Sequence, residues 1–160
     1  MNGTAHGALV VLHVVSAVVG FGAVAVTGAY AAAARASPDP LGEVPLIRYF
    51  RPGTNWAART LLVIPVFGMA LVFSGHRSTV SEAWPWIGLG LWVVACGLAS
   101  AVCWPAERAI QLWLAGRPDP NRGAVDLAGF RRACARAEWS AAAVSVCFVA
   151  AVVIMIAQPI

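Results

Sequence analysis

Charged side chains are scarce in this sequence of 160 residues. Asp, Glu, Lys and Arg make up only 11% of it, whereas 60% of the residues are hydrophobic. A soluble domain carries about 25% charged residues, so the composition excludes an ordinary soluble domain. Lysine is absent, and every basic side chain is an arginine. These arginines are not interleaved with aromatic residues on a soluble face, which argues against nucleic acid as a partner.

The residue patterns of common catalytic centres are also missing. The sequence has no HExxH pair, no nucleophile elbow and no glycine loop for phosphate, and it offers no paired carboxylates. All acids are expected in loops or at helix ends, mostly beside arginines, as Glu107 is beside Arg108 and Glu138 follows Arg136. A proton-driven transporter normally needs an acid within the membrane. Enzyme activity is therefore disfavoured, and transport would need a small oligomer.

Long apolar stretches are what the sequence does contain. Four of them match the roughly 20 apolar residues that a membrane helix needs, and they predict spans at about residues 7–34, 56–75, 84–105 and 138–157. The first stretch lacks a basic segment before it and is too long for a signal peptide, so we expect a retained helix. The fold class is predicted to be all-α, a four-transmembrane-helix bundle forming one membrane domain over residues 1–160.

The arginines indicate the topology. The first and third predicted loops, with the helix ends that flank them, hold every arginine except Arg77. With four spans these two loops share one side of the membrane, and the positive-inside rule makes that side cytoplasmic. The sequence therefore predicts a multi-pass protein of the bacterial inner membrane with its N- and C-termini outside.

The third loop contains two amphipathic patterns. Ala106, Ile110 and Trp113 share one helical face, and Leu127, Phe130 and Cys134 share another. The sequence "GRPDPNRG" between them is a turn signal. We expect helices three and four to continue into the cytoplasm as a short hairpin, or to bend along the membrane surface.

The segment "YFRPGTNWAAR", residues 49–59, has two interpretations. In the first it starts the second helix: Pro-Gly turns the chain, Thr54 or Asn55 caps the helix, Trp56 lies at headgroup level and Arg59 reaches the cytoplasmic surface. In the second, arginines bind an anionic lipid headgroup or the carboxylates of a partner. The arginines concerned are Arg48, Arg51, Arg59, Arg131 and Arg132.

The first helix carries a stripe of residues seven apart, namely His6, His13, Gly20 and Thr27. Small residues let membrane helices approach closely, so this face is predicted to point inward. His6 and His13 point the same way but lie ~10 Å apart along the axis, so they cannot ligate one metal ion together.

His13 is the candidate functional residue, because an ionisable side chain within a span is functional by default. Three roles stay open for it. It hydrogen-bonds a neighbouring helix, it ligates haem b whose flat ring lies over Gly20, or it has a metal or proton role. The candidate metal ligands are His6 and His76, which are expected at similar depth. A second haem ligand would be His76 or Met69, depending on the offset of helix two.

Three quoted segments carry a resemblance over residues 12–71. "LHVVSAVVGFG", "YFRPGTNWAAR" and "VIPVFGMAL" resemble a family of small, uncharacterised bacterial integral membrane proteins with four helices, known mainly from actinobacteria. This resemblance implies the four-helix membrane fold and supplies no activity. The chain is also similar to copper-resistance-D-like proteins and haem-linked protoporphyrinogen oxidases, a similarity that rests on His13 and the helix count.

These observations favour a non-catalytic integral membrane protein, either an accessory subunit of a membrane complex or a binding module. Its partners would be the lipid bilayer and other membrane subunits or further copies of itself. The first alternative is a b-type haem or quinone-linked electron-transfer protein that uses His13. The second alternative is a small oligomeric transporter.

Overall fold

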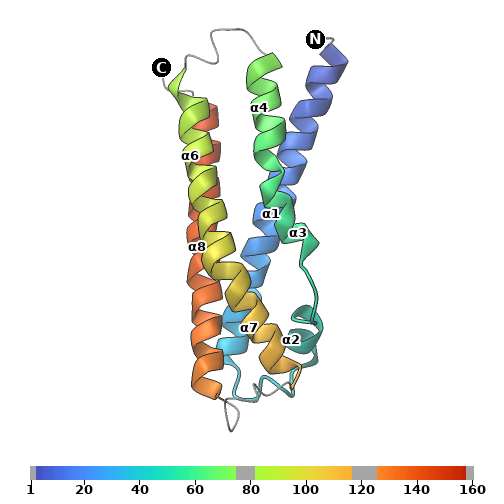
Figure 1. Ribbon diagram of the computed structural model, residues 1–160, viewed down its shortest axis with the longest axis vertical. Helices are drawn as coiled ribbons and strands as arrows, with labels where there is room; N and C mark the ends of the chain where they lie inside the picture. Colours follow the sequence, from blue (N-terminus) through green and yellow to red (C-terminus); the bar gives the residue numbers. More distant parts are fainter. Residues whose placement is uncertain (1–2, 75–81, 117–125, 158–160) are drawn as a thin grey trace. The chain divides into compact units, whose positions relative to one another are not determined.

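The computed structural model describes residues 3–74, 82–116 and 126–157 (Figure 1). The described part of the chain is 87% helical and contains no strand. The predicted all-α fold class is therefore confirmed.

Four helical segments are long and apolar enough to cross a membrane, as predicted. They are α1 (Gly3–Ala36); Trp56–Ser74, made of α3 (Trp56–Arg59), the 3₁₀ turn η1 (Thr60–Leu62) and α4 (Ile64–Ser74); Ala83–Leu114, made of α6 (Ala83–Leu98), the π-helical η2 (Ala99–Cys103) and α7 (Trp104–Leu114); and α8 (Leu127–Ala157). The short helix α2 (Val44–Tyr49) lies in the first loop.

Helices three and four extend beyond their predicted spans, as the amphipathic patterns indicate. The third segment continues to Leu114, and α8 already begins at Leu127. Most of the predicted turn at residues 116–123 lies outside the described residues.

Pro65 explains the irregular second segment. A proline has no backbone N–H, so Pro65 cannot donate the helical hydrogen bond to the carbonyl of Leu61. The chain forms the 3₁₀ turn η1 just before this point, and the indole N–H of Trp92 on α6 donates to that carbonyl at 2.8 Å. The Leu61 carbonyl, which lacks its helical donor because of the proline, thus receives a hydrogen bond from a neighbouring helix, as expected for backbone in an apolar environment.

Pro105 has a similar effect on the third segment. It lies in the first turn of α7, directly after the π-helical turn η2. In a regular α-helix the proline ring would clash with the carbonyl of the residue four positions earlier. The π turn avoids this clash, so the helix continues past Pro105.

The described contacts divide the chain into two compact units. Unit 1 comprises residues 1–23, 55–96 and 144–160, and unit 2 comprises residues 24–54 and 97–143. Segments of α1, α6 and α8 belong to both units.

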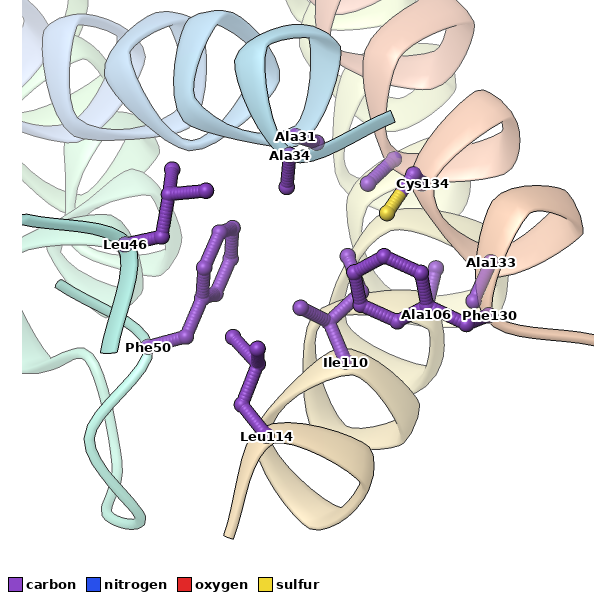
Figure 2. Packing of buried hydrophobic residues seen from close by; sticks show 11 residues of the cluster. Ala31, Ala34, Leu46, Phe50, Ala106, Ile110, Leu114, Phe130, Ala133 and Cys134 are labelled. Atoms are coloured by element: carbon purple, nitrogen blue, oxygen red, sulfur yellow. The ribbon is translucent and has the colours of Figure 1, made fainter. Parts of the chain in front are cut away.

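Unit 2 contains a dense hydrophobic core (Figure 2). Phe50, at the end of α2, points toward Leu114 of α7, and the ring of Phe130 on α8 stacks on Trp113 at a centroid distance of 4.0 Å. Alanines of α1, α7 and α8 bring the helices close together. The buried cluster consists of Ala31, Ala34, Leu46, Phe50, Ala106, Ile110, Leu114, Phe130, Ala133, Cys134 and Ala137.

Candidate functional site

Unit 1 contains a partly open cavity of about 540 Å³. Its walls come from the unit 1 parts of α1, α4, α6 and α8, and most lining side chains are aliphatic. Aromatic and sulfur-containing side chains also line it: Phe21, Met69, Trp84, Trp92, Phe148 and Met155. The imidazoles of His6 and His13 face the same space.

His13 has a defined orientation within this cavity. Its Nδ1 lies 3.1 Å from the carbonyl oxygen of Ile64 on α4. A carbonyl oxygen only accepts hydrogen bonds, so Nδ1 carries the proton and donates it. In the neutral ring, this tautomer has its lone pair on Nε2. Of the three roles that the sequence left open, the structure shows the hydrogen bond to a neighbouring helix.

Gly68 makes room for the His13 ring. A Cβ atom at this position would lie 2.9 Å from Cε1 and 3.3 Å from Nδ1 of His13, closer than real Cβ contacts. A side chain at this position would therefore displace the imidazole from its place against α4. The sequence analysis did not name Gly68 as a site residue; its position one turn after Ile64 was the only signal for it.

Gly20 does not belong to the cavity. A Cβ on Gly20 would lie 2.7 Å from the backbone nitrogen and 2.9 Å from Cα of Leu61. The space over Gly20, which was expected to hold a flat ring, is filled by the backbone of η1. Gly20 instead allows close contact between two helices, the other role predicted for the stripe on the first helix.

The predicted metal ligands are not brought together in the described residues. His6 is exposed and lines the cavity, while His76 lies outside the described residues. Within residues 3–74, 82–116 and 126–157, no group of three or more His, Cys, Asp or Glu side chains is arranged to hold a metal ion.

The segment at residues 49–59 takes the structural role predicted for it. The side-chain oxygen of Asn55 accepts the backbone N–H of Ala58 at 3.2 Å and caps α3. Trp56 is 76% exposed, as a headgroup-level indole would be. Arg48 and Arg51 are exposed, and Arg59 is half-buried and has a contact of its own.

The arginines of α8 have different environments. Arg131 is exposed, and Arg132 lies 3.5 Å from the carboxylate of Asp126. The prediction that Glu138 pairs with Arg136 is wrong, because Glu138 forms an ion pair with Arg35 of α1 at 2.8 Å. Arg35 and Glu138 meet here from two different helices, whereas residues two apart on one helix point in different directions.

Glu107 was missed by the sequence analysis. It was expected at a helix end beside Arg108, yet it is 6% exposed within α7. Arg108 instead donates to the side-chain oxygen of Gln111 at 3.3 Å, and the Gln111 amide donates to the carbonyl of Gly53 at 3.2 Å. Unit 2 therefore buries polar side chains that the sequence placed at its surface.

Tyr49 belongs to the same polar region of unit 2. Its hydroxyl forms a 2.8 Å hydrogen bond with the buried hydroxyl of Thr27, and its ring stacks on Tyr30 at 4.0 Å. Burial raises the pKa of Tyr49 above its ordinary value of 10.0, and the nearby carboxylate of Glu107 adds to the rise, while the bond to Thr27 lowers it. Tyr49 therefore stays neutral at physiological pH.

A comparison with protein families decides the affiliation of the chain. Residues 8–159 match the model of the family described as predicted integral membrane protein (DUF2269). The chain belongs to the DUF2269 family. No curated protein and no solved structure matches the chain.

Membership in DUF2269 agrees with the four apolar helices, so the chain is an integral membrane protein. It also agrees with the resemblance to an uncharacterised family of bacterial membrane proteins. The match gives no support to the similarity with the haem-linked oxidases.

Proposed function

We propose that this DUF2269 protein is a non-catalytic binding module of the membrane, in which the cavity of unit 1 holds a lipid-soluble ligand. The observation that carries the proposal is the cavity itself, at about 540 Å³. Pockets for small molecules measure about 300–1,000 Å³ and are mainly apolar with few polar groups. This cavity has that size and that kind of lining.

The lining selects for neutral, apolar molecules. Moving an ionised group into apolar surroundings without a partner is very costly. No Arg, Asp or Glu is among the described residues that line the cavity. Aromatic rings and methionine side chains such as Trp92, Phe148 and Met155 offer polarisable contacts to a flat or flexible apolar molecule.

Unit 2 would supply the contacts of an accessory subunit. Every described arginine except Arg59 belongs to unit 2, and Arg48, Arg51 and Arg131 are exposed there. Positive charge next to membrane helices is attracted to anionic lipid headgroups and to acidic partners. The positive-inside rule supports an orientation in the bacterial inner membrane with these arginines cytoplasmic and both termini outside.

The test of the binding function is a cavity-filling substitution. Gly88 lines the cavity, and a Cβ there would meet only the Met155 methyl group at 3.6 Å, an ordinary contact. Gly88→Leu therefore fills the space without straining the backbone. Gly90→Leu is the matched control, because Gly90 lies on the same helix, does not line the cavity and has nothing within 4 Å of its Cβ position.

The measurement is saturable binding of radiolabelled decylbenzene to purified protein in mild detergent. Wild type and Gly90→Leu should bind with equal affinity, and Gly88→Leu should lose saturable binding. Unchanged binding by Gly88→Leu would show that the ligand is held elsewhere.

A b-type haem protein is the second candidate function. Ligating histidines usually donate their other ring N–H to a carbonyl or carboxylate, which is the geometry of His13 on Ile64. The residues fit this group only in part, because no arginine among the described lining residues is available to pair with the propionates. An absorption spectrum of the purified protein decides: a Soret band that is lost in His13→Ala supports haem, and a featureless visible spectrum removes it.

A further inference from the structure

We propose that the ligand of the unit 1 cavity carries a ring hydroxyl that donates a hydrogen bond to Nε2 of His13. The chemical class is that of phenols and hydroquinones with an apolar tail. This inference rests on the proposed binding function and names the ligand class of the same cavity.

Three ring N–H donors of the cavity wall are already engaged. The Nδ1–H of His13 donates to the carbonyl of Ile64 at 3.1 Å, and the indole N–H of Trp92 donates to the carbonyl of Leu61 at 2.8 Å. The indole N–H of Trp84 donates to the carboxylate of Glu82. These three rings thus present no free N–H donor to a ligand.

One acceptor remains at the depth of His13. With Nδ1 protonated, the neutral imidazole has its lone pair on Nε2. The other histidine of the lining, His6, is exposed and lies about two helical turns away along α1. Among the described residues no hydrogen bond to Nε2 of the partly buried His13 is seen, so a ligand that brings an O–H group gains a bond there.

The aromatic part of the cavity wall favours a ring as the bearer of that hydroxyl. Phe21 and Phe148 stack at 4.7 Å and form part of the cavity wall, together with Trp92. Aromatic pairs add attraction beyond the area they bury. The remaining walls are aliphatic and suit an alkyl or isoprenoid tail.

Donor and acceptor chemistry distinguishes a hydroquinone from the corresponding quinone. The hydroquinone carries O–H donors, whereas the quinone carries only carbonyl acceptors and cannot bond to a lone pair. A net hydrogen bond of ordinary strength corresponds to a preference of about threefold to tenfold in affinity.

The experiment compares three probes in mild detergent without oxygen: decylhydroquinone, decylquinone and decylbenzene. Their dissociation constants are measured for wild type, His13→Phe and His13→Gln. Wild type should bind the hydroquinone about threefold to tenfold more tightly than the quinone. His13→Phe should bind decylbenzene but lose the preference, and His13→Gln, whose amide oxygen accepts hydrogen bonds, should regain part of it.

The outcomes separate the two proposals. Equal affinities of wild type for hydroquinone and quinone, or a preference that survives in His13→Phe, would overturn the hydroxyl inference while decylbenzene binding still supports the cavity. Saturable binding of none of the three probes would overturn the binding function as well. Should His13→Phe fail to fold, the affinity ratio of wild type decides.

Discussion

The two units use similar helices in different ways. Unit 2 packs a continuous core around Phe50 and Ile110, and it holds every described acid except Glu82. Unit 1 contains a cavity lined mainly by apolar side chains, and His13, one of its few polar lining residues, is oriented by a bond to the carbonyl of Ile64. Close packing of a protein interior leaves few voids larger than a water molecule. Unit 1 has a cavity of about 540 Å³ and unit 2 has a filled core, and the proposed binding function of unit 1 would account for this contrast.

The two units also differ in how their polar groups find hydrogen-bond partners. In unit 1 the Leu61 carbonyl lacks its helical donor because of Pro65, and the side chain of Trp92 from another helix donates to it instead. In unit 2 the buried side chain of Thr27 and the partly buried side chain of Tyr49 bond to each other. Unit 1 is thus held by a few directed contacts around a space, and unit 2 by packing with an internal polar group.

The largest expected effect comes from truncating the core of unit 2. Ile110 is 0% exposed, so Ile110→Ala should lower the free energy of unfolding by about 2–5 kcal/mol. Val14 lines the cavity of unit 1 and is 51% exposed, so Val14→Ala should change it by less than about 0.5 kcal/mol. Unfolding in mixed detergent micelles measures both. Similar losses for the two variants would contradict the contrast between the units.

The next prediction compares two glycines of α1, at which a change to alanine should shift the free energy of unfolding in opposite directions. A Cβ on Gly28 in unit 2 would lie 2.6 Å from Cβ of Ala141, so Gly28→Ala should destabilise the protein by about 1–3 kcal/mol. Gly22 in unit 1 has nothing within 4 Å of its Cβ position, so Gly22→Ala should stabilise the helix by about 0.5–1 kcal/mol. The same unfolding assay tests the pair, and a stabilised Gly28→Ala would show that α1 and α8 do not meet there.

The smallest effect concerns the hydrogen bond around Pro65. Trp92→Phe removes the donor to the Leu61 carbonyl and should cost about 1 kcal/mol. In a Pro65→Ala background the new backbone N–H can serve the same carbonyl, so Trp92→Phe should cost less. A double-mutant cycle measures this coupling. Additive effects would mean that the indole bond does not replace the missing helical one.

The sequence predicted the features that depend on local pattern. Apolar length revealed the four spans, amphipathic spacing indicated the extended third and fourth helices, and of the two predicted cap residues, Thr54 and Asn55, it is Asn55 that caps α3. Each of these depends on residues near one another in the chain.

Features that depend on how different helices meet were not predictable. Gly68 was overlooked and Gly20 was assigned to a ligand space, because a sequence does not say which glycine faces which neighbour. Glu107 was placed at a helix end, since its burial comes from the packing of unit 2. The orientation of His13 required the carbonyl of Ile64, a residue distant in sequence.

The most direct test of the binding cavity is native mass spectrometry of the protein extracted from its membranes in mild detergent. The account predicts that wild type and Gly90→Leu carry a small apolar molecule in addition to their own mass, and that Gly88→Leu does not. The same bound mass on Gly88→Leu, or bare protein for all three variants, would contradict a ligand-binding cavity in unit 1.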